Sequence, residues 1–106
     1  MELTRKEAVR LFRKQWTEMA EKGWDKMRYF GDFPYEEIPY NECYLCELVM
    51  ARDRPCRECP IEWGGGRECQ VPSSPYSIWL NARYAHNEVL MAKYAKLISE
   101  LPEREE

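Results

Sequence analysis

Apolar and polar residues alternate with a helical period over the first part of the chain. The apolar positions recur every three or four residues, at Ala8, Val9, Phe12, Trp16, Met19 and Ala20. This spacing places them on one face of an α-helix. Thr4 and Glu7 have the spacing of a capping box, and Gly23 can end the helix in a left-handed conformation. The pattern predicts an amphipathic helix over residues 1–23, with Trp16 in the core.

A second amphipathic pattern occupies the last third of the chain. Ser74 suits an N-cap, and Pro75 suits the first helical position. The apolar stripe that follows contains Tyr76, Trp79, Leu80, Leu90, Met91, Tyr94, Leu97, Ile98 and Leu101. Asn87 either caps a second helix or lies within one longer helix. We expect a helical tail over residues 74–101, as one helix or a pair, that ends at Pro102 and frays beyond it.

The segment between these patterns is rich in aromatic residues. Residues 24–42 contain Trp24, Tyr29, Phe30, Phe33, Tyr35 and Tyr40. Gly31, Pro34 and Pro39 interrupt any long regular element there. We expect an aromatic loop with a short strand near Ile38–Tyr40, whose rings fold back onto the core. An exposed aromatic surface for a partner is the alternative.

The cysteines are concentrated in a centre that spans residues 43–72. Cys43-Tyr44-Leu45-Cys46 and Cys56-Arg57-Glu58-Cys59 are two C-x2-C pairs, and Cys69 follows them. A tight turn within each pair aims both sulfurs at one point, and two such pairs surround a tetrahedral ion. Zn²⁺ accepts sulfur ligands and imposes no redox chemistry. The pattern predicts one structural zinc ion, held by four of the five cysteines Cys43, Cys46, Cys56, Cys59 and Cys69.

The same five cysteines suit other roles to different degrees. Four thiolates also suit an iron–sulfur cluster, and Cys59-Pro60 is similar to the end of a ferredoxin cysteine run. An odd cysteine count argues against a disulfide framework. A thioredoxin-type site needs a βαβ pattern, which the sequence does not indicate. His86, the one histidine, is a further candidate ligand, although a lone histidine after a helix is more often a surface residue.

The length of the chain indicates one small domain. A chain of 106 residues corresponds to one domain, 1–106. Its core is modest and needs an additional cross-link, such as a structural metal. The fold class we expect is a small metal-stabilised α-rich domain, α+β at most, with an N-terminal helix, a cysteine zinc-knuckle centre and a C-terminal helix or helix pair. No apolar run approaches the length of a membrane span, and no signal peptide is visible, so we expect a cytoplasmic protein.

The charges are unevenly distributed. A net charge of -3 argues against non-specific nucleic-acid binding as the main activity. The first helix is nevertheless basic, through Arg5, Lys6, Arg10, Arg13 and Lys14. These residues form either a solvated face or a docking face for nucleic acid or an acidic partner. Four arginines lie among the cysteines, where they offset thiolate charge or bind phosphate or carboxylate groups: Arg52, Arg54, Arg57 and Arg67.

The order of the motifs resembles a group of small cysteine-rich proteins from bacteriophages and prophages. The matching residues are Cys43-x2-Cys46, Cys56-x2-Cys59-Pro60-Ile61-x-Trp63, Cys69 and Ser74-Pro75-Tyr76-x2-Trp79, after a first helix that contains Trp16. The resemblance implies a phage origin, hence the host cytoplasm, and a metal-binding structural core. It implies no activity.

The sequence favours a binding module over an enzyme. It contains none of the common nucleotide-binding, zinc-protease or hydrolase motifs, and a site closed by four cysteines leaves no open position for a substrate. We expect a host or phage protein as the partner, with nucleic acid as an alternative through the basic first helix. The alternative function is an iron–sulfur or thiol redox protein that uses the same cysteines. A free, exposed Cys69 with a lowered pKa would then be the nucleophile or sensor.

Overall fold

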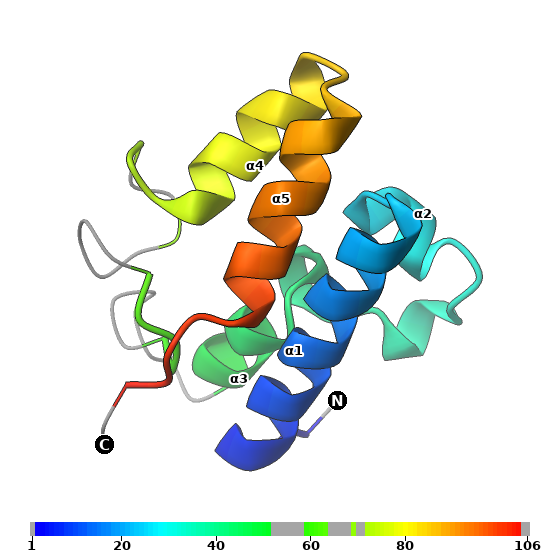
Figure 1. Cartoon of the computed structure of the whole chain (residues 1–106). Helices are drawn as coiled ribbons and strands as arrows, with labels where there is room; N and C mark the ends of the chain where they lie inside the picture. The colour runs from blue at the N-terminus through cyan, green and yellow to red at the C-terminus, as the bar shows by residue number, and fades with distance from the viewer. Residues whose placement is uncertain (1, 52–58, 64–68, 70–71, 105–106) are drawn as a thin grey trace.

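The computed structural model describes residues 2–51, 59–63, 69 and 72–104, and this part of the chain is mostly helical (Figure 1). The helices are α1 (Arg5–Lys22), α2 (Lys26–Phe30), α3 (Tyr44–Ala51), α4 (Pro75–Tyr84) and α5 (Glu88–Ser99), with 3-10 turns at Tyr35–Glu37 and Tyr40–Glu42. Among the described residues, the β-structure is limited to one isolated bridge between Ile61 and Glu103. The α-rich fold class is therefore confirmed.

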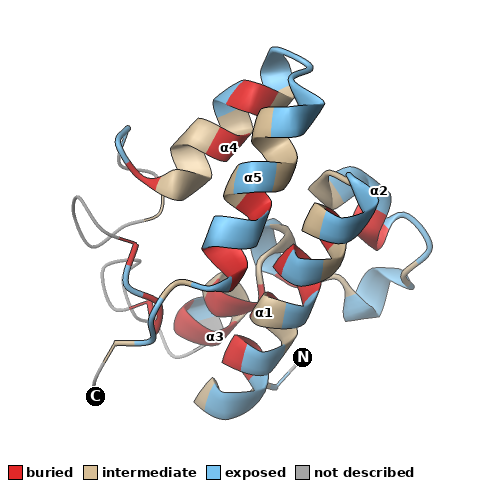
Figure 2. Cartoon of the chain, viewed as in Figure 1, coloured by how far each residue is buried: buried red, intermediate tan, exposed pale blue. Residues whose placement is uncertain are grey.

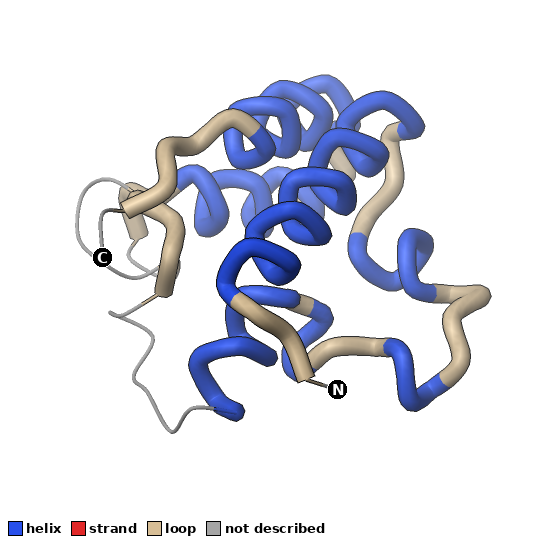
Figure 3. Tube along the Cα trace, turned by 90° about the horizontal axis from the view of Figure 1, so that it is seen from below, coloured by secondary structure: helices blue, strands red, loops and turns tan. Residues whose placement is uncertain are grey.

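The long helix α1 holds the arrangement together. It packs against α5 along one side and against α3 on another, and α5 also packs against α4. Figure 3 shows these helices from below, with the loops around residues 31–43 extending to one side. The molecule is flattened, with extents of 35 × 34 × 19 Å. No helix in the described ranges is long and apolar enough to cross a membrane.

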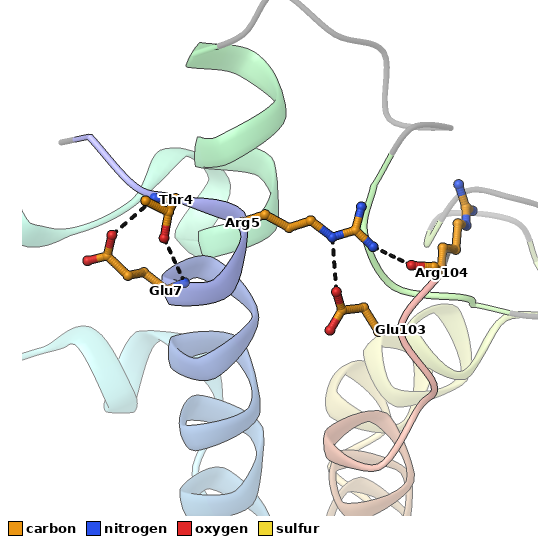
Figure 4. A network of polar contacts seen from close by, with 5 residues as sticks. All are labelled: Thr4, Arg5, Glu7, Glu103 and Arg104. Carbon is orange, nitrogen blue, oxygen red and sulfur yellow. Dashed lines mark hydrogen bonds and ion pairs between the residues drawn. The ribbon is translucent and has the colours of Figure 1, made fainter. Parts of the chain in front are cut away.

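The start of α1 matches the sequence prediction. Glu7 N donates to Thr4 Oγ1 over 3.1 Å, and Thr4 N donates to the Glu7 carboxylate over 3.2 Å, so both bonds of the capping box form (Figure 4). At the other end, Gly23 adopts a φ of 69° and donates to the carbonyl of Met19. A residue with a Cβ is strained in that conformation, so glycine suits the position.

The helical tail is a pair of helices. Ser74 caps α4 and Pro75 is its first residue, as predicted. Asn87 caps α5, because its side-chain oxygen accepts from Leu90 N over 3.1 Å. Of the two alternatives for Asn87, the structure therefore selects the cap. Each helix start is specified by a side chain that accepts a backbone N–H which no helical carbonyl can reach.

The aromatic segment is more ordered than the sequence suggests. It contains α2, which begins at Asp25 because the Asp25 carboxylate accepts from Arg28 N over 2.8 Å. The predicted strand near Ile38–Tyr40 is wrong, since Ile38 and Pro39 connect two 3-10 turns. Pro39 has no N–H to donate to a strand ladder, and no described strand lies beside it to pair with.

The C-terminal segment is also better ordered than predicted. Residues 102–104 run antiparallel to residues 60–62, joined by backbone hydrogen bonds of 2.9 and 2.7 Å. Arg5 reaches across from α1 to the Glu103 carboxylate at 2.9 Å and to the Arg104 carbonyl (Figure 4). The expectation of fraying after Pro102 is therefore wrong for residues 103 and 104, and residues 105–106 lie outside the described part.

The core is built largely from aromatic rings between the helices. Figure 2 marks buried positions along α1, α3, α4 and α5. Trp16 of α1 and Trp79 of α4 meet edge to face, with ring centroids 4.9 Å apart. The prediction that Trp16 is a core residue is confirmed. Within the aromatic segment, Tyr29 and Phe30 are buried whereas Tyr35 is 89% exposed, so the rings fold back only in part.

Replacing Trp16 with alanine tests how much this aromatic packing stabilises the fold. We expect Trp16→Ala to lower the free energy of unfolding by about 3–5 kcal/mol, because it removes a fully buried ring. Tyr84→Ala is the matched control, since Tyr84 is 68% exposed. Its effect should stay within about 0.5 kcal/mol. Urea unfolding, monitored by the circular dichroism of the helical backbone, measures the free energy of unfolding of both variants. Equal losses of stability in the two variants would contradict a core centred on Trp16.

Candidate metal centre

Four of the five predicted ligands are described, and they come from three segments of the chain. Cys43 lies directly before α3, and Cys46 lies in its first turn. Cys59 begins the segment 59–63, and Cys69 precedes α4. None of the four is joined in a disulfide. Cys56 lies outside the described residues, as do the arginines predicted to offset the thiolate charge, Arg52, Arg54, Arg57 and Arg67.

A small cavity brings three of these cysteines together. It has a volume of about 190 Å³, and Cys43, Cys46 and Cys69 all line it. Aromatic rings of the core form much of its wall: Phe12, Trp16, Trp63 and Tyr76. Cys59 adjoins this wall, because its sulfur accepts from Trp63 Nε1 over 3.5 Å. The fold thus gathers cysteines that are distant in sequence around one aromatic cavity.

The first C-x2-C pair is placed by a helix start. The Cys43 carbonyl accepts from Glu47 N over 3.0 Å, so Cys43 occupies the cap position of α3. The backbone N–H groups of Leu45 and Cys46 donate to the Cys43 sulfur. The sulfur therefore does the work of a capping oxygen, at the helix end where negative charge is stabilised. Cys46 follows three residues later and lies on the same side of the helix.

An unusual backbone conformation leads the chain into this cap. Asn41 and Glu42 have φ values of 56° and 52°, in the left-handed region that non-glycine residues seldom adopt. Their carbonyls are held by two side chains: Lys26 Nζ donates to Asn41 O over 3.3 Å, and Gln15 Nε2 donates to Glu42 O over 3.4 Å. These bonds offset the backbone strain and fix the direction in which Cys43 enters α3.

The cap of α4 positions Cys69 in a similar way. The Ser74 hydroxyl donates to the Cys69 carbonyl and accepts from Ser77 N over 3.2 Å. Ser74 is fully buried, and both of these bonds are partly buried. One side chain therefore starts α4 and ties the Cys69 backbone to it.

The surroundings of Cys43 lower the pKa of its thiol. A hydrogen bond from the Cys46 thiol, the Lys26 ammonium and the N–H groups at the start of α3 together outweigh burial, and they lower the pKa of Cys43 to about 6. Cys59 behaves in the opposite way. Burial raises the pKa of Cys59, and the nearby negative charge of Cys43 raises it further, against a hydrogen bond from Trp63. The surroundings of Cys43 thus favour the thiolate form, whereas those of Cys59 favour the thiol form.

A lysine that the sequence did not single out completes the cavity. Lys26 Nζ donates to the Tyr76 hydroxyl over 3.0 Å and lies 4.6 Å from the centroid of the Tyr76 ring. Burial lowers the pKa of Lys26, but the charges of Cys43, Tyr76 and Cys46 outweigh it and raise the pKa overall. In the sequence, Lys26 is one cation in an aromatic segment, with no spacing that links it to the cysteines 17 or more positions away.

The sulfur atoms in this cavity are of the type that binds zinc, although the described side chains do not form a closed coordination shell. Within the described ranges, no three His, Cys, Asp or Glu side chains are grouped closely enough to hold a metal ion. The thiols that share the cavity are nevertheless the ligands that Zn²⁺ prefers, and the Cys43 environment favours the thiolate form that binds metal. His86 is exposed, in the turn between α4 and α5, and lines a separate cavity with Trp24 and Asp25.

Comparison with known proteins adds no assignment. No protein-family model, curated protein or solved structure matches this chain. The resemblance to the phage group therefore stays a prediction, and the function is argued from the site.

The two opposed thiol environments predict different alkylation profiles. In metal-free protein prepared with a chelator, we expect iodoacetamide to modify Cys43 half-maximally near pH 6, because the thiolate that reacts is present above its pKa. Cys59 should react only at distinctly higher pH. Peptide mass spectrometry across a pH series measures each site, and urea-unfolded protein gives the reference near pH ~8.5. A Cys43 profile that coincides with this reference would contradict the site geometry.

Proposed function

We propose that this protein is a small zinc-binding module with a structural four-cysteine site. The observation that carries the proposal is the convergence of Cys43, Cys46 and Cys69 on one cavity, with Cys59 against its wall. Cys43 and Cys46 are two of the ligands, and two of Cys56, Cys59 and Cys69 complete the set. A zinc ion there would join α3, the segment 59–63 and the start of α4.

The chemistry of such a site is structural. Four thiolates leave no coordination position open for water or substrate, so the ion would supply folding energy rather than catalysis. The chain has a modest core, and the segment 59–63 contributes Ile61 and Trp63 to it. A metal that fixes this segment against α3 would stabilise the arrangement on which the C-terminal residues 102–104 pair.

The working surface of the module would lie on its helices. Arg5 and Arg13 of α1 bind the C-terminal segment and the end of α5, since Arg13 donates to the Ser99 carbonyl over 2.9 Å. Lys6, Arg10 and Lys14 remain exposed on the same helix. We infer a host or phage protein as partner, supported by the net charge of -3. Nucleic acid, bound through this smaller basic face, is the alternative. On the phage resemblance, we propose the host cytoplasm as the location of the protein.

A thiol redox or iron–sulfur protein is the second candidate. It is favoured by the hydrogen bond between the Cys46 and Cys43 thiols at the start of α3, together with the Cys43 pKa of about 6. In such a protein the Cys43 thiolate would attack a disulfide of a partner and release one partner thiolate, and Cys46 would then attack the mixed disulfide and release the second, so that the pair is oxidised to a disulfide and the partner is reduced to a dithiol.

Elemental analysis and a visible spectrum of freshly purified protein separate the two candidates. We expect one zinc ion per chain and no visible absorbance. Iron with a broad absorbance near ~400 nm would favour the iron–sulfur alternative. Metal-free protein whose Cys43 and Cys46 cycle between dithiol and disulfide would favour the redox alternative and overturn the zinc proposal.

Removing one ligand tests whether the metal is structural. We expect Cys43→Ser to lose zinc and its cooperative thermal transition, because the free energy of metal binding contributes to folding. Lys14→Ala changes an exposed residue and should shift the free energy of unfolding by no more than about 0.5 kcal/mol. Treating the unaltered protein with a chelator should reproduce the Cys43→Ser melting curve. A native melting curve for Cys43→Ser would show that zinc does not support the fold.

A further inference from the structure

Lys26 is set apart from the other lysines by what surrounds it. It lies in the cavity that Cys43, Cys46 and Cys69 share, and it is the one basic residue among the described residues that line this cavity. Its ammonium donates to the Tyr76 hydroxyl over 3.0 Å and to the Asn41 carbonyl over 3.3 Å. Neither of these partners is a carboxylate, and both direct the ammonium into the cavity.

The position of the ammonium is fixed from two sides. Lys26 is the first residue of α2, and the cap of that helix, Asp25, also binds Arg83 of α4 at 3.1 Å. Tyr76, which contacts the Lys26 ammonium through its hydroxyl and ring, belongs to α4 as well. Because α2 and α4 are tied together on both sides of Lys26, its side chain is held in the cavity rather than free to turn to solvent.

The counter-charge for this lysine is then the thiolate group. Among the described residues, Lys26 makes no ion pair with a carboxylate. A charge that is partly removed from water is costly unless an opposite charge or several hydrogen bonds compensate it. Four thiolates around one Zn²⁺ leave a net double negative charge, which is costly in an aromatic cavity for the same reason.

We propose that Lys26 is the charge-balancing residue of the thiolate centre, and that its ammonium raises the affinity of the site for zinc while making the bound thiolates less nucleophilic. The inference rests on the proposed zinc site and adds a positioning residue to it. Lys26 does not bind the metal. It acts through the ligands Cys43 and Cys46, much as the outer partners of metal ligands do at other sites.

Zinc affinity of Lys26→Met is the first test. Methionine keeps the length and apolar stem of the side chain but removes its charge. We expect a loss of roughly 10–100-fold in competition against a chromophoric zinc chelator, the range for lost outer-shell partners. Lys22→Met is the matched control, because Lys22 Nζ lies 4.5 Å from the Trp24 ring centroid in a similar cation–π contact but lines no part of the thiol cavity. Its affinity should equal that of the unaltered protein.

A second readout separates charge from packing. The rate at which iodoacetamide alkylates the zinc-loaded protein should rise several-fold in Lys26→Met and return toward the original rate in Lys26→Arg, which restores the charge. If Lys26→Met does not fold, Tyr76→Phe tests the same point, because it keeps Lys26 but removes the hydroxyl that directs it. We expect this variant to bind zinc more weakly and to be alkylated faster.

The outcomes distinguish this inference from the zinc site itself. If the unaltered protein binds no zinc, the proposed function fails. If it binds zinc and Lys26→Met has the same affinity and alkylation rate, the zinc site stands and the role of Lys26 is overturned. Equal loss of affinity in Lys26→Met and Lys26→Arg, with no change in alkylation rate, would also overturn it, because a packing role gives that result.

Discussion

The structure depends on the aromatic layer that covers the inner face of α1. Trp16 packs edge to face against Trp79, and Phe12 does the same against Trp63, at centroid distances of 4.9 and 5.7 Å. These contacts join α1 to α4 and to the segment 59–63. Phe12, Trp16 and Trp63 also line the thiol cavity. The core and the candidate site therefore share their residues, and a change in one is transmitted to the other through close packing.

Three helix starts place the chemistry on that wall. Cys43 caps α3 with its own sulfur, Ser74 caps α4 and binds the Cys69 backbone, and Asp25 caps α2 so that Lys26 is its first residue. Each cap satisfies N–H groups that a helix leaves unpaired at its start. Since the N-terminal end of a helix carries partial positive charge, helix starts near this cavity favour thiolates. A fold that is held by ordinary capping thus also creates an environment for anionic sulfur.

Local signals in the sequence were sufficient for the long helices and insufficient for what lies between them. The capping box of Thr4, the glycine at position 23 and the Ser74-Pro75 start all act within a few residues, so each can be recognised without the fold. The pairing of residues 102–104 with 60–62 joins positions about forty residues apart. Lys26 and Cys43 line the same cavity because the fold brings α2 against Tyr76 of α4. Nothing in the spacing of those residues encodes these contacts. Of the five cysteines predicted as candidates, three share the cavity and Cys59 adjoins it.

The contrast between Cys43 and Cys59 shows why a metal ion suits this arrangement. Burial raises the pKa of Cys59 and the negative charge of Cys43 adds to this effect, so a second thiolate beside the first is unfavourable without a compensating cation. In the proposed site Zn²⁺ would remove this obstacle, because a divalent ion compensates both sulfurs at once and deprotonates a coordinating thiol outright. Lys26 would compensate part of the negative charge that remains on the zinc-bound thiolates. Thiolates that repel one another without the ion would attract a common centre with it, and the free energy of this change would go into holding α3, the segment 59–63 and the start of α4 together.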